Sequence, residues 1–239
     1  MLSRDHYRDA SLFHYPDCLR ENGYAVLGEE RFIDASPIEK MLFDNQLAAM
    51  TWAETLDFGV HFAALASPDG TLDVRPFGNA DHRRVERDGR WTSNAAFCPD
   101  IVAWLEESGL NYGSVRILRK SNDIRDLRTI DQARTLYHRD TTNLYAEPGD
   151  AGWIVRLLIQ ISDDRQSLFL CRAAMDAPER QLPLGRGIQI LFDADQLWHT
   201  IWHPSPTPRY ALLVSLESSP ALDAWVAASH PALAPGGRA

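Results

Sequence analysis

The chain has 239 residues, 45% of them hydrophobic and 24% charged, which suits one globular domain able to stabilise its own core. A net charge of −9 argues against sequence-independent binding to nucleic acid, and no apolar run is long enough to cross a bilayer. The three cysteines lack metal-type spacing and argue against a disulfide framework. We therefore expect a cytoplasmic protein without a membrane segment, with one domain over residues 1–230 and a disordered tail over 231–239. The sequence leaves the oligomeric state unknown.

Residues 1–112 predict a helical and loop-rich first part. A Ser-Pro-Ile-Glu start combines a capping box with proline at the first helical position, and it predicts a helix over residues 36–50. A second helix is predicted over residues 100–108. Between them, residues 66–94 carry several turn signals, and such a region on a compact domain is a candidate lid over a site.

From residue 113 the chain changes to short runs rich in β-branched, aromatic and leucine residues, separated by turn-type clusters. Seven such runs without helical patterns between them predict a mainly β fold with N-terminal helices. An antiparallel sandwich or barrel such as a jelly roll, with its core over 113–218, fits best. The predicted strands cover residues 115–118, 134–138, 153–162, 167–172, 187–193, 197–203 and 209–217.

The sequence His138-Arg139-Asp140 is a candidate metal half-site. Residues two apart on a strand point to the same face, so the imidazole and the carboxylate can converge on one ion while Arg139 points away. His199, on a later predicted strand, is the best third ligand. Two histidines and one carboxylate leave coordination positions open, as in non-haem Fe(II) oxygenases, whereas a structural zinc site is usually closed by four ligands.

Arg209 indicates which kind of ligand could occupy those open coordination positions. It lies ten residues after His199, beyond a proline-rich turn, at the start of the last predicted strand. A dicarboxylate such as 2-oxoglutarate could chelate iron through its keto-acid end and pair with the Arg209 guanidinium through the other end. Without that counter-charge, burial of the second carboxylate would cost several kcal/mol.

This arrangement of His-x-Asp, a distal histidine and an arginine ten residues later resembles the Fe(II)/2-oxoglutarate-dependent oxygenase superfamily. The resemblance covers roughly residues 113–218 and implies a double-stranded β-helix, a cupin-like form of the jelly roll. It also implies that His138, Asp140 and His199 bind Fe(II), that Arg209 binds 2-oxoglutarate, and that O₂ is consumed in a hydroxylation.

One position departs from the pattern of this superfamily. Many members have a serine two places after the arginine, which donates a second hydrogen bond to the cosubstrate, whereas this chain has Ala211. Another donor is then required. Tyr210, or a residue of an earlier strand such as Arg119 or Arg156, is a candidate for it.

Further residues are candidates for contact with the substrate. Asn143 and Tyr145 follow the His-x-Asp motif, where the family often contacts its substrate. Arg156 and Arg172 lie in otherwise apolar strands, where each is either solvated or grips a carboxylate of substrate or cosubstrate. His203 is a rival to His199, but it lies only six residues before Arg209.

The carboxylate at Asp140 favours hydroxylation, because related halogenases have Gly or Ala at that position. In scale the chain resembles small bacterial members that hydroxylate free amino acids or natural-product intermediates. A small-molecule substrate is therefore expected, with desaturation or cyclisation left open. Two alternatives stand beside this one: a cupin-like metalloenzyme that does not use 2-oxoglutarate, and a metal-free binding domain in which His138 is an ordinary surface histidine.

Overall fold

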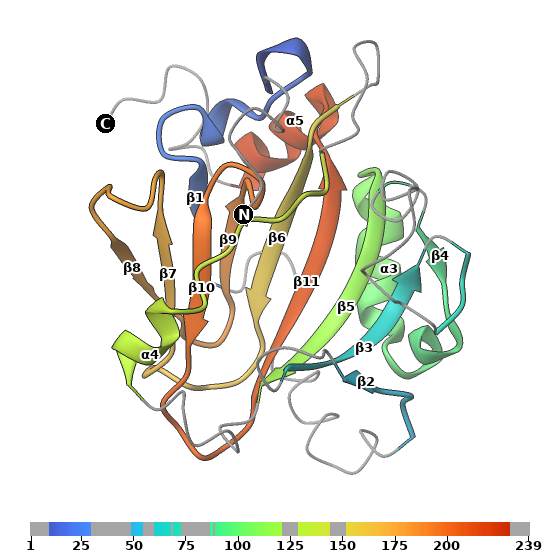
Figure 1. Ribbon diagram of the computed structural model, residues 1–239. Coiled ribbons are helices and arrows are strands. Elements are labelled where there is room, and N and C mark those ends of the chain that lie inside the picture. Colours follow the sequence, from blue (N-terminus) through green and yellow to red (C-terminus); the bar gives the residue numbers. More distant parts are fainter. Residues whose placement is uncertain are drawn as a thin grey trace.

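Two antiparallel β-sheets face each other in the computed structural model of the chain (Figure 1). The structure describes residues 10–29, 49–54, 60–67, 69–72, 87, 89–120, 129–143 and 152–229. Residues 36–48 of the predicted helix, Tyr145, much of the predicted lid and the tail lie outside these residues, and residues 49–50 form a turn. The described elements are η2 (Ala10–Leu12), η3 (Asp17–Leu19), β1 (Tyr24–Glu29), β2 (Ala53–Glu54), β3 (Val60–Ser67), β4 (Arg90–Trp91), η5 (Ser93–Phe97), α3 (Pro99–Ser108), β5 (Tyr112–Lys120), α4 (Ile130–Arg134), β6 (Ile154–Gln160), β7 (Leu168–Arg172), β8 (Arg180–Pro183), β9 (Ile188–Phe192), β10 (Trp198–Trp202), β11 (Arg209–Glu217) and α5 (Pro220–Ser229).

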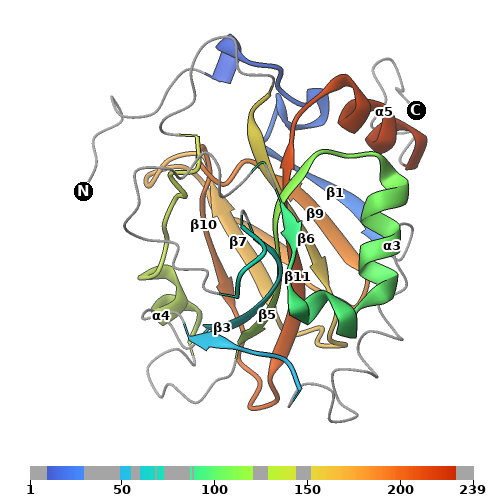
Figure 2. The ribbon, with the colours of Figure 1, turned by 90° about the vertical axis from the view of Figure 1, so that its right-hand side faces the viewer.

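The larger sheet has the strand order β1-β9-β6-β11-β5-β3-β2, with β4 paired to β3. The smaller sheet has the order β10-β7-β8, and an isolated bridge from His138 to His199 adds one more segment beside β10. Figure 2 shows the smaller sheet on one side of the larger sheet and helix α3 on the other. This is the mainly β, jelly-roll arrangement that the sequence predicted, with four strands (β5, β11, β6 and β9) forming the middle of the larger sheet.

Strand β6 shows how the larger sheet separates two packed layers. All seven of its residues are buried. Val155, Leu157 and Ile159 belong to the outer core, between the sheet and helices α3 and α5, whereas Leu158 belongs to the core between the two sheets. Since neighbouring residues of a strand point to opposite faces, a strand covered on both faces must be apolar throughout. Arg156 and Gln160, both on the inner face, are the two exceptions.

Strand β11 follows the same alternation. Tyr210 and Leu212 pack in the outer core, while Ala211 and Leu213 pack in the core between the sheets. Arg209 shares the face of Ala211, because it precedes it by two residues. The space between the two sheets therefore receives side chains of opposite character: mainly apolar ones, plus a few charged groups.

The prediction of a strand over residues 134–138 was wrong. Helix α4 ends within this segment at Arg134, and only His138 makes a strand-like bridge. Thr129 caps the helix and forms a full capping box with Gln132. This Thr-x-x-Gln signal is visible in the sequence and outweighs the local β-propensity of the residues that follow it. The predicted strands over 115–118, 153–162, 167–172, 187–193, 197–203 and 209–217 all correspond to observed strands, and the helix over 100–108 corresponds to α3.

Several elements were not predicted. Strands β1 and β3, from the first part of the chain, extend the larger sheet, and β8 forms one edge of the smaller sheet. Strand β3 contains three alanines, which favour helix locally, but pairing with β5 and burial of six consecutive residues decide its conformation. Within the described part, no helix combines the length and apolar character that crossing a membrane requires.

Helix α3 ends at Gly109, which has φ 65° in the left-handed region. We expect Gly109→Ala to lower the free energy of unfolding by about 1 kcal/mol, because a Cβ is disfavoured in this conformation. A Cβ there would meet no atom within 4 Å, so the loss isolates backbone strain from steric clash. Denaturant titration measures it. Gly185→Ala is the matched control, since its added Cβ would make only ordinary contact with Ile188, and its stability should not fall.

Candidate metal centre

Two backbone hydrogen bonds bring the two histidines of the predicted site together. The His138 amide donates to the His199 carbonyl at 3.2 Å, and the His199 amide donates to the His138 carbonyl at 2.9 Å. Residues bridged in this way lie directly opposite each other, so their side chains share a face. The ring centroids are 4.5 Å apart. The two rings therefore stand side by side at the edge of the smaller sheet.

The outer hydrogen bonds of the rings determine which nitrogen faces the site. His138 Nδ1 lies 3.0 Å from the Leu136 carbonyl, and His199 Nδ1 lies 3.0 Å from the Leu197 carbonyl. A carbonyl can only accept, so each Nδ1 carries a proton and Nε2 is the nitrogen left to face the site. Metal-binding histidines are commonly oriented by such outer hydrogen bonds.

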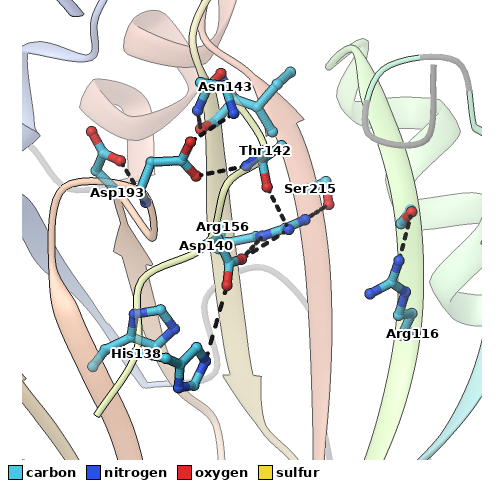
Figure 3. Close-up of polar contacts among 12 residues, drawn as sticks. Arg116, His138, Asp140, Thr142, Asn143, Arg156, Asp193 and Ser215 are labelled. Atoms are coloured by element: carbon cyan, nitrogen blue, oxygen red, sulfur yellow. Dashed lines mark hydrogen bonds and ion pairs between the residues drawn. The ribbon is translucent and has the colours of Figure 1, made fainter. Parts of the chain in front are cut away.

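Asp140 completes the cluster from the same segment as His138. One ligand atom from each of His138, Asp140 and His199 lies within 4.8 Å of the other two, and Asp140 Oδ1 is 4.0 Å from His138 Nε2. Figure 3 shows the Asp140 carboxylate between the imidazole groups on one side and the Arg156 guanidinium on the other. The three side chains that the sequence predicted as ligands are thus brought to one place.

Arg156 holds the second oxygen of that carboxylate. Its Nε and Nη2 atoms donate to Asp140 Oδ2 at 3.1 and 2.9 Å, and Nη2 also donates to Thr142 Oγ1 at 2.9 Å. Nη1 donates to Ser215 on β11. Because Oδ2 is occupied by these donors, Oδ1 is the oxygen left to face a metal ion. The sequence assigned Arg156 to the cosubstrate, but the structure pairs it with Asp140.

The segment after His138 is fastened by the turn between β9 and β10. The Asp140 amide donates to the Ala194 carbonyl at 2.9 Å. The Asp195 carboxylate accepts from the amides of Thr142 and Asn143, at 3.2 and 2.6 Å. These contacts fix the backbone of an irregular segment that ordinary sheet hydrogen bonds do not reach.

The electrostatics of the cluster suit metal binding at neutral pH. Burial alone would raise the pKa of Asp140, but the Arg156 guanidinium, which is charged and donates hydrogen bonds to it, outweighs burial and leaves that pKa below its ordinary value. Burial lowers the pKa of His199 to about 4, helped by His138. Asp140 is therefore ionised and His199 neutral near pH 7, the states in which these groups coordinate a metal.

Arg209 is a buried cation with unsatisfied hydrogen-bond donors among the described residues. Its side chain is 2% exposed, and Nε and Nη2 have no hydrogen-bond partner. Burial lowers the pKa of Arg209 to about 10, so it remains charged at neutral pH. An unpaired buried charge costs several kcal/mol, which a bound anion would offset. The guanidinium faces the same space between the sheets as the metal cluster.

Other predicted residues have different surroundings. The Tyr210 side chain packs in the outer core, with Trp52 at 6.5 Å between ring centroids, so it faces away from Arg209. The Asn143 amide bonds both backbone groups of Ile154. Arg172 lies 4.0 Å over the Tyr137 ring. Neither Asn143 nor Arg172 is brought to the metal cluster.

His203, the rival ligand, is bound at both ring nitrogens. Nδ1 lies 2.8 Å from an Asp164 carboxylate oxygen, and Nε2 lies 2.7 Å from the Thr207 carbonyl. These contacts close the turn that precedes β11. The structure therefore groups His199, and not His203, with His138 and Asp140.

A cavity of about 410 Å³ lies apart from this cluster, between the segment before β1 and the β7–β8 hairpin. Its lining includes Tyr15, Arg20, Arg172 and Arg180, but no member of the triad. Arg20 and Arg172 already contact acidic side chains. We therefore assign the chemistry to the triad, where ligand atoms converge, rather than to this cavity.

No family model and no curated protein matches the chain. Among solved structures, a 2OG-Fe(II) oxygenase family oxidoreductase from Burkholderia pseudomallei superposes with a TM-score of 0.50 at 14% identity, over 84% of this chain and 87% of that one. Two others have lower TM-scores. The α-ketoglutarate-dependent carbocyclase SnoK of nogalamycin biosynthesis gives 0.47 at 18% identity, covering 91% and 84% of the two chains. A Trichoplax adhaerens prolyl hydroxylase gives 0.46 at 12%, covering 84% and 86%. The chain has the jelly-roll fold of the Burkholderia oxygenase.

Replacing Arg156 should weaken metal binding. We expect Arg156→Met to raise the dissociation constant for Mn²⁺ about 10- to 100-fold, because Asp140 loses the group that orients it. Anaerobic calorimetric titration measures this. Arg172→Met is the control, since it also removes a strand arginine but one that contacts no ligand. Unchanged affinity in a folded Arg156→Met protein would contradict the positioning role.

Replacing Arg209 should stabilise the protein without ligands. Arg209→Met removes a buried unpaired charge and keeps an apolar stem, so we expect the free energy of unfolding to rise by about 1–3 kcal/mol. Urea titration at neutral pH would show this. A loss of stability would mean that the guanidinium has an internal partner.

Proposed function

We propose that this chain is an Fe(II)- and 2-oxoglutarate-dependent oxygenase that hydroxylates a small molecule. The observation that supports this most strongly is the pairing of two features in one space. A His-Asp-His cluster lies at the edge of the smaller sheet, and the Arg209 guanidinium, whose Nε and Nη2 have no acceptor among the described residues, faces the same interior from the larger sheet. The His-Asp-His cluster alone, or the buried Arg209 alone, would not indicate this class of enzyme.

The donor set of the cluster fits Fe(II). His138, Asp140 and His199 would hold the ion and leave open the positions that a cosubstrate and O₂ need. Bound together, iron, 2-oxoglutarate and O₂ supply the oxidising power for hydroxylation of a C–H bond. The protein contributes two imidazoles, that of His199 neutral, an ionised carboxylate, and an arginine that keeps the carboxylate oriented.

The surroundings of Arg209 fit the distal carboxylate of 2-oxoglutarate. A guanidinium offers two parallel donors to a carboxylate, and here two of its nitrogen atoms lack any other acceptor. Aromatic rings cover His199 on the inner side of the cluster: Phe169 stacks on it at 6.0 Å between centroids, and Phe192 packs edge-on at 5.2 Å. A dry interior strengthens the attraction between such charged groups.

Hydroxylation is proposed over halogenation because Asp140 occupies the carboxylate position. The net charge of −9 favours a small molecule over nucleic acid, and a free amino acid or natural-product intermediate is the proposed substrate class. Cys18, Cys98 and Cys171 are free thiols, which supports a reducing cytoplasm. A cupin-like metalloenzyme without 2-oxoglutarate stays as the second candidate, but it gives no role to Arg209.

Binding of the cosubstrate is the decisive test. Anaerobic protein with Fe(II) should develop a visible charge-transfer band when 2-oxoglutarate is added. We expect the band to vanish in His138→Ala, which lacks a ligand, and to require at least about 100-fold more 2-oxoglutarate in Arg209→Met, which lacks the counter-charge. Absorption titration gives both results.

Turnover supplies the second half of that test. Wild-type protein should release succinate from 2-oxoglutarate, faster when the right amino acid or related small molecule is present, whereas His138→Ala should release none. Iron binding without any 2-oxoglutarate effect would favour the cupin-like alternative. If the wild-type protein binds no divalent metal, the alternative of a metal-free binding domain is favoured.

A further inference from the structure

Lys120 is a second cation beside Arg209. In the pairing of β5 with β11, Arg209 lies directly opposite Lys120. Side chains at opposed positions of an antiparallel pair share a face, with Cβ atoms roughly 5 Å apart. Both residues are buried, at 9% and 2% exposure. The larger sheet therefore directs an ammonium and a guanidinium together into the space between the sheets.

The ammonium of Lys120 reaches the opposite sheet. Its Nζ donates to the Ile201 carbonyl of β10 at 2.6 Å. Ile201 lies two residues beyond His199 on the same strand, a separation of about 7 Å along β10. A lysine ammonium has three donors, so this contact leaves two for another acceptor. The lysine is thus held at a defined distance from a metal ligand.

The charges near this pair do not balance. Burial, followed by repulsion from Arg209, lowers the pKa of Lys120 to about 8. Asp164 is the acid that acts on Arg209, but its carboxylate already contacts His203 and Ser167. Within the described residues, two adjacent buried cations, of which only Arg209 feels an acid and that acid is already engaged, favour binding of an anion.

The spacing fits a short diacid. The five-carbon chain of 2-oxoglutarate is roughly 5 Å long, given C–C bonds of about 1.5 Å. One end could then lie at the metal ligands while the other end reaches the two cations. Lys120 contacts the carbonyl of Ile201, two residues after His199. Ala211, at the place where the resemblance leads one to expect a hydroxyl donor, cannot supply a second hydrogen bond to the distal carboxylate.

We propose that Lys120 is the second anchor of the distal carboxylate, forming with Arg209 a two-cation cradle whose distance from the metal is set by the Ile201 carbonyl. This inference rests on the proposed function. It makes Lys120 a determinant of cosubstrate specificity: the cradle selects 2-oxo acids with a second carboxylate at the far end of a five-carbon chain.

The test is equilibrium binding to Mn²⁺-loaded protein by calorimetry, which needs no turnover. Two ligands are compared: 2-oxoglutarate, and 2-oxopentanoate, which has the same chain length but no distal carboxylate. Lys120→Met should weaken 2-oxoglutarate binding about 10- to 100-fold and change 2-oxopentanoate binding little, because only the distal carboxylate loses a partner. Mn²⁺ affinity should stay unchanged.

Arg119→Met is the matched control. It removes a cation from the neighbouring position of β5, where the side chain points to the opposite face and pairs across the sheet with Tyr210. Its 2-oxoglutarate affinity should stay within about twofold of wild type. The Lys120→Arg protein keeps the charge and should bind 2-oxoglutarate more tightly than Lys120→Met.

The pH dependence gives an independent readout. Among the described residues, Lys120 lies opposite Arg209 of β11 and Val60 of β3, and its charge acts on His203 in the turn before β11. Without ligand its ammonium loses its proton as the pH rises past about 8, so wild-type affinity for 2-oxoglutarate should fall above that pH, by up to about tenfold per pH unit. Lys120→Arg should show no such fall between about pH 7 and about pH 9.

The outcomes separate this inference from the function beneath it. If Arg209→Met loses 2-oxoglutarate binding but Lys120→Met binds like wild type, the second anchor is wrong and the oxygenase proposal stands. Equal losses for both 2-oxo acids in Lys120→Met would also overturn it, because the lysine would then only support the fold. If wild-type protein does not bind 2-oxoglutarate, the proposed function itself fails.

Discussion

The pair of backbone hydrogen bonds between His138 and His199 is the constraint on which the candidate site depends. Strand β10 is held in the smaller sheet by β7, so His199 has a fixed position. Within the described residues, the segment carrying His138 makes no other strand bridge, so this bridge and the contacts of the following residues with the β9–β10 turn position it. Two residues later the same segment delivers Asp140. One short antiparallel contact thus converts two distant parts of the chain into one cluster of donors.

The interior between the sheets combines apolar packing with three buried cations of different status. Arg156 is fully engaged, and its partners are a proposed metal ligand and two hydroxyls. Lys120 is partly engaged through one carbonyl, and Arg209 has no acceptor for two of its nitrogens. This order matches the proposed roles: Arg156 supports the metal centre, whereas Lys120 and Arg209 receive a ligand, because only groups with unsatisfied donors gain by binding one.

The sequence allowed prediction of the parts of the fold that are decided locally. Runs such as residues 153–162 are apolar on both faces, and short turns bound them, so they form strands wherever they pack. The strand over 134–138 failed because the capping box at Thr129 was overlooked. Strand β3 could not be predicted, because its alanines become a strand only through pairing with β5.

In the candidate site too, some features could be predicted from the sequence and others depend on the tertiary structure. The spacing of His138, Asp140, His199 and Arg209 is visible along the chain, and the structure brings the first three together. The partner of Arg156 and the place of Lys120 depend on strand register, which no local pattern specifies. The scarcity of lysine was the one sequence signal at Lys120, because Lys40 is the only other lysine in the chain.

The smaller sheet ends at β8, and the composition of that strand affects how the molecule behaves in a crowded solution. Arg180, Gln181 and Pro183 are exposed along it. A proline offers no amide hydrogen to an incoming strand, and an arginine resists stacking against a copy of itself. The free rim of the sheet is therefore a poor template for polymerisation. Replacing Pro183 by a β-branched residue would remove that protection. The variant would then self-associate through this edge while the packing of the interior stays intact.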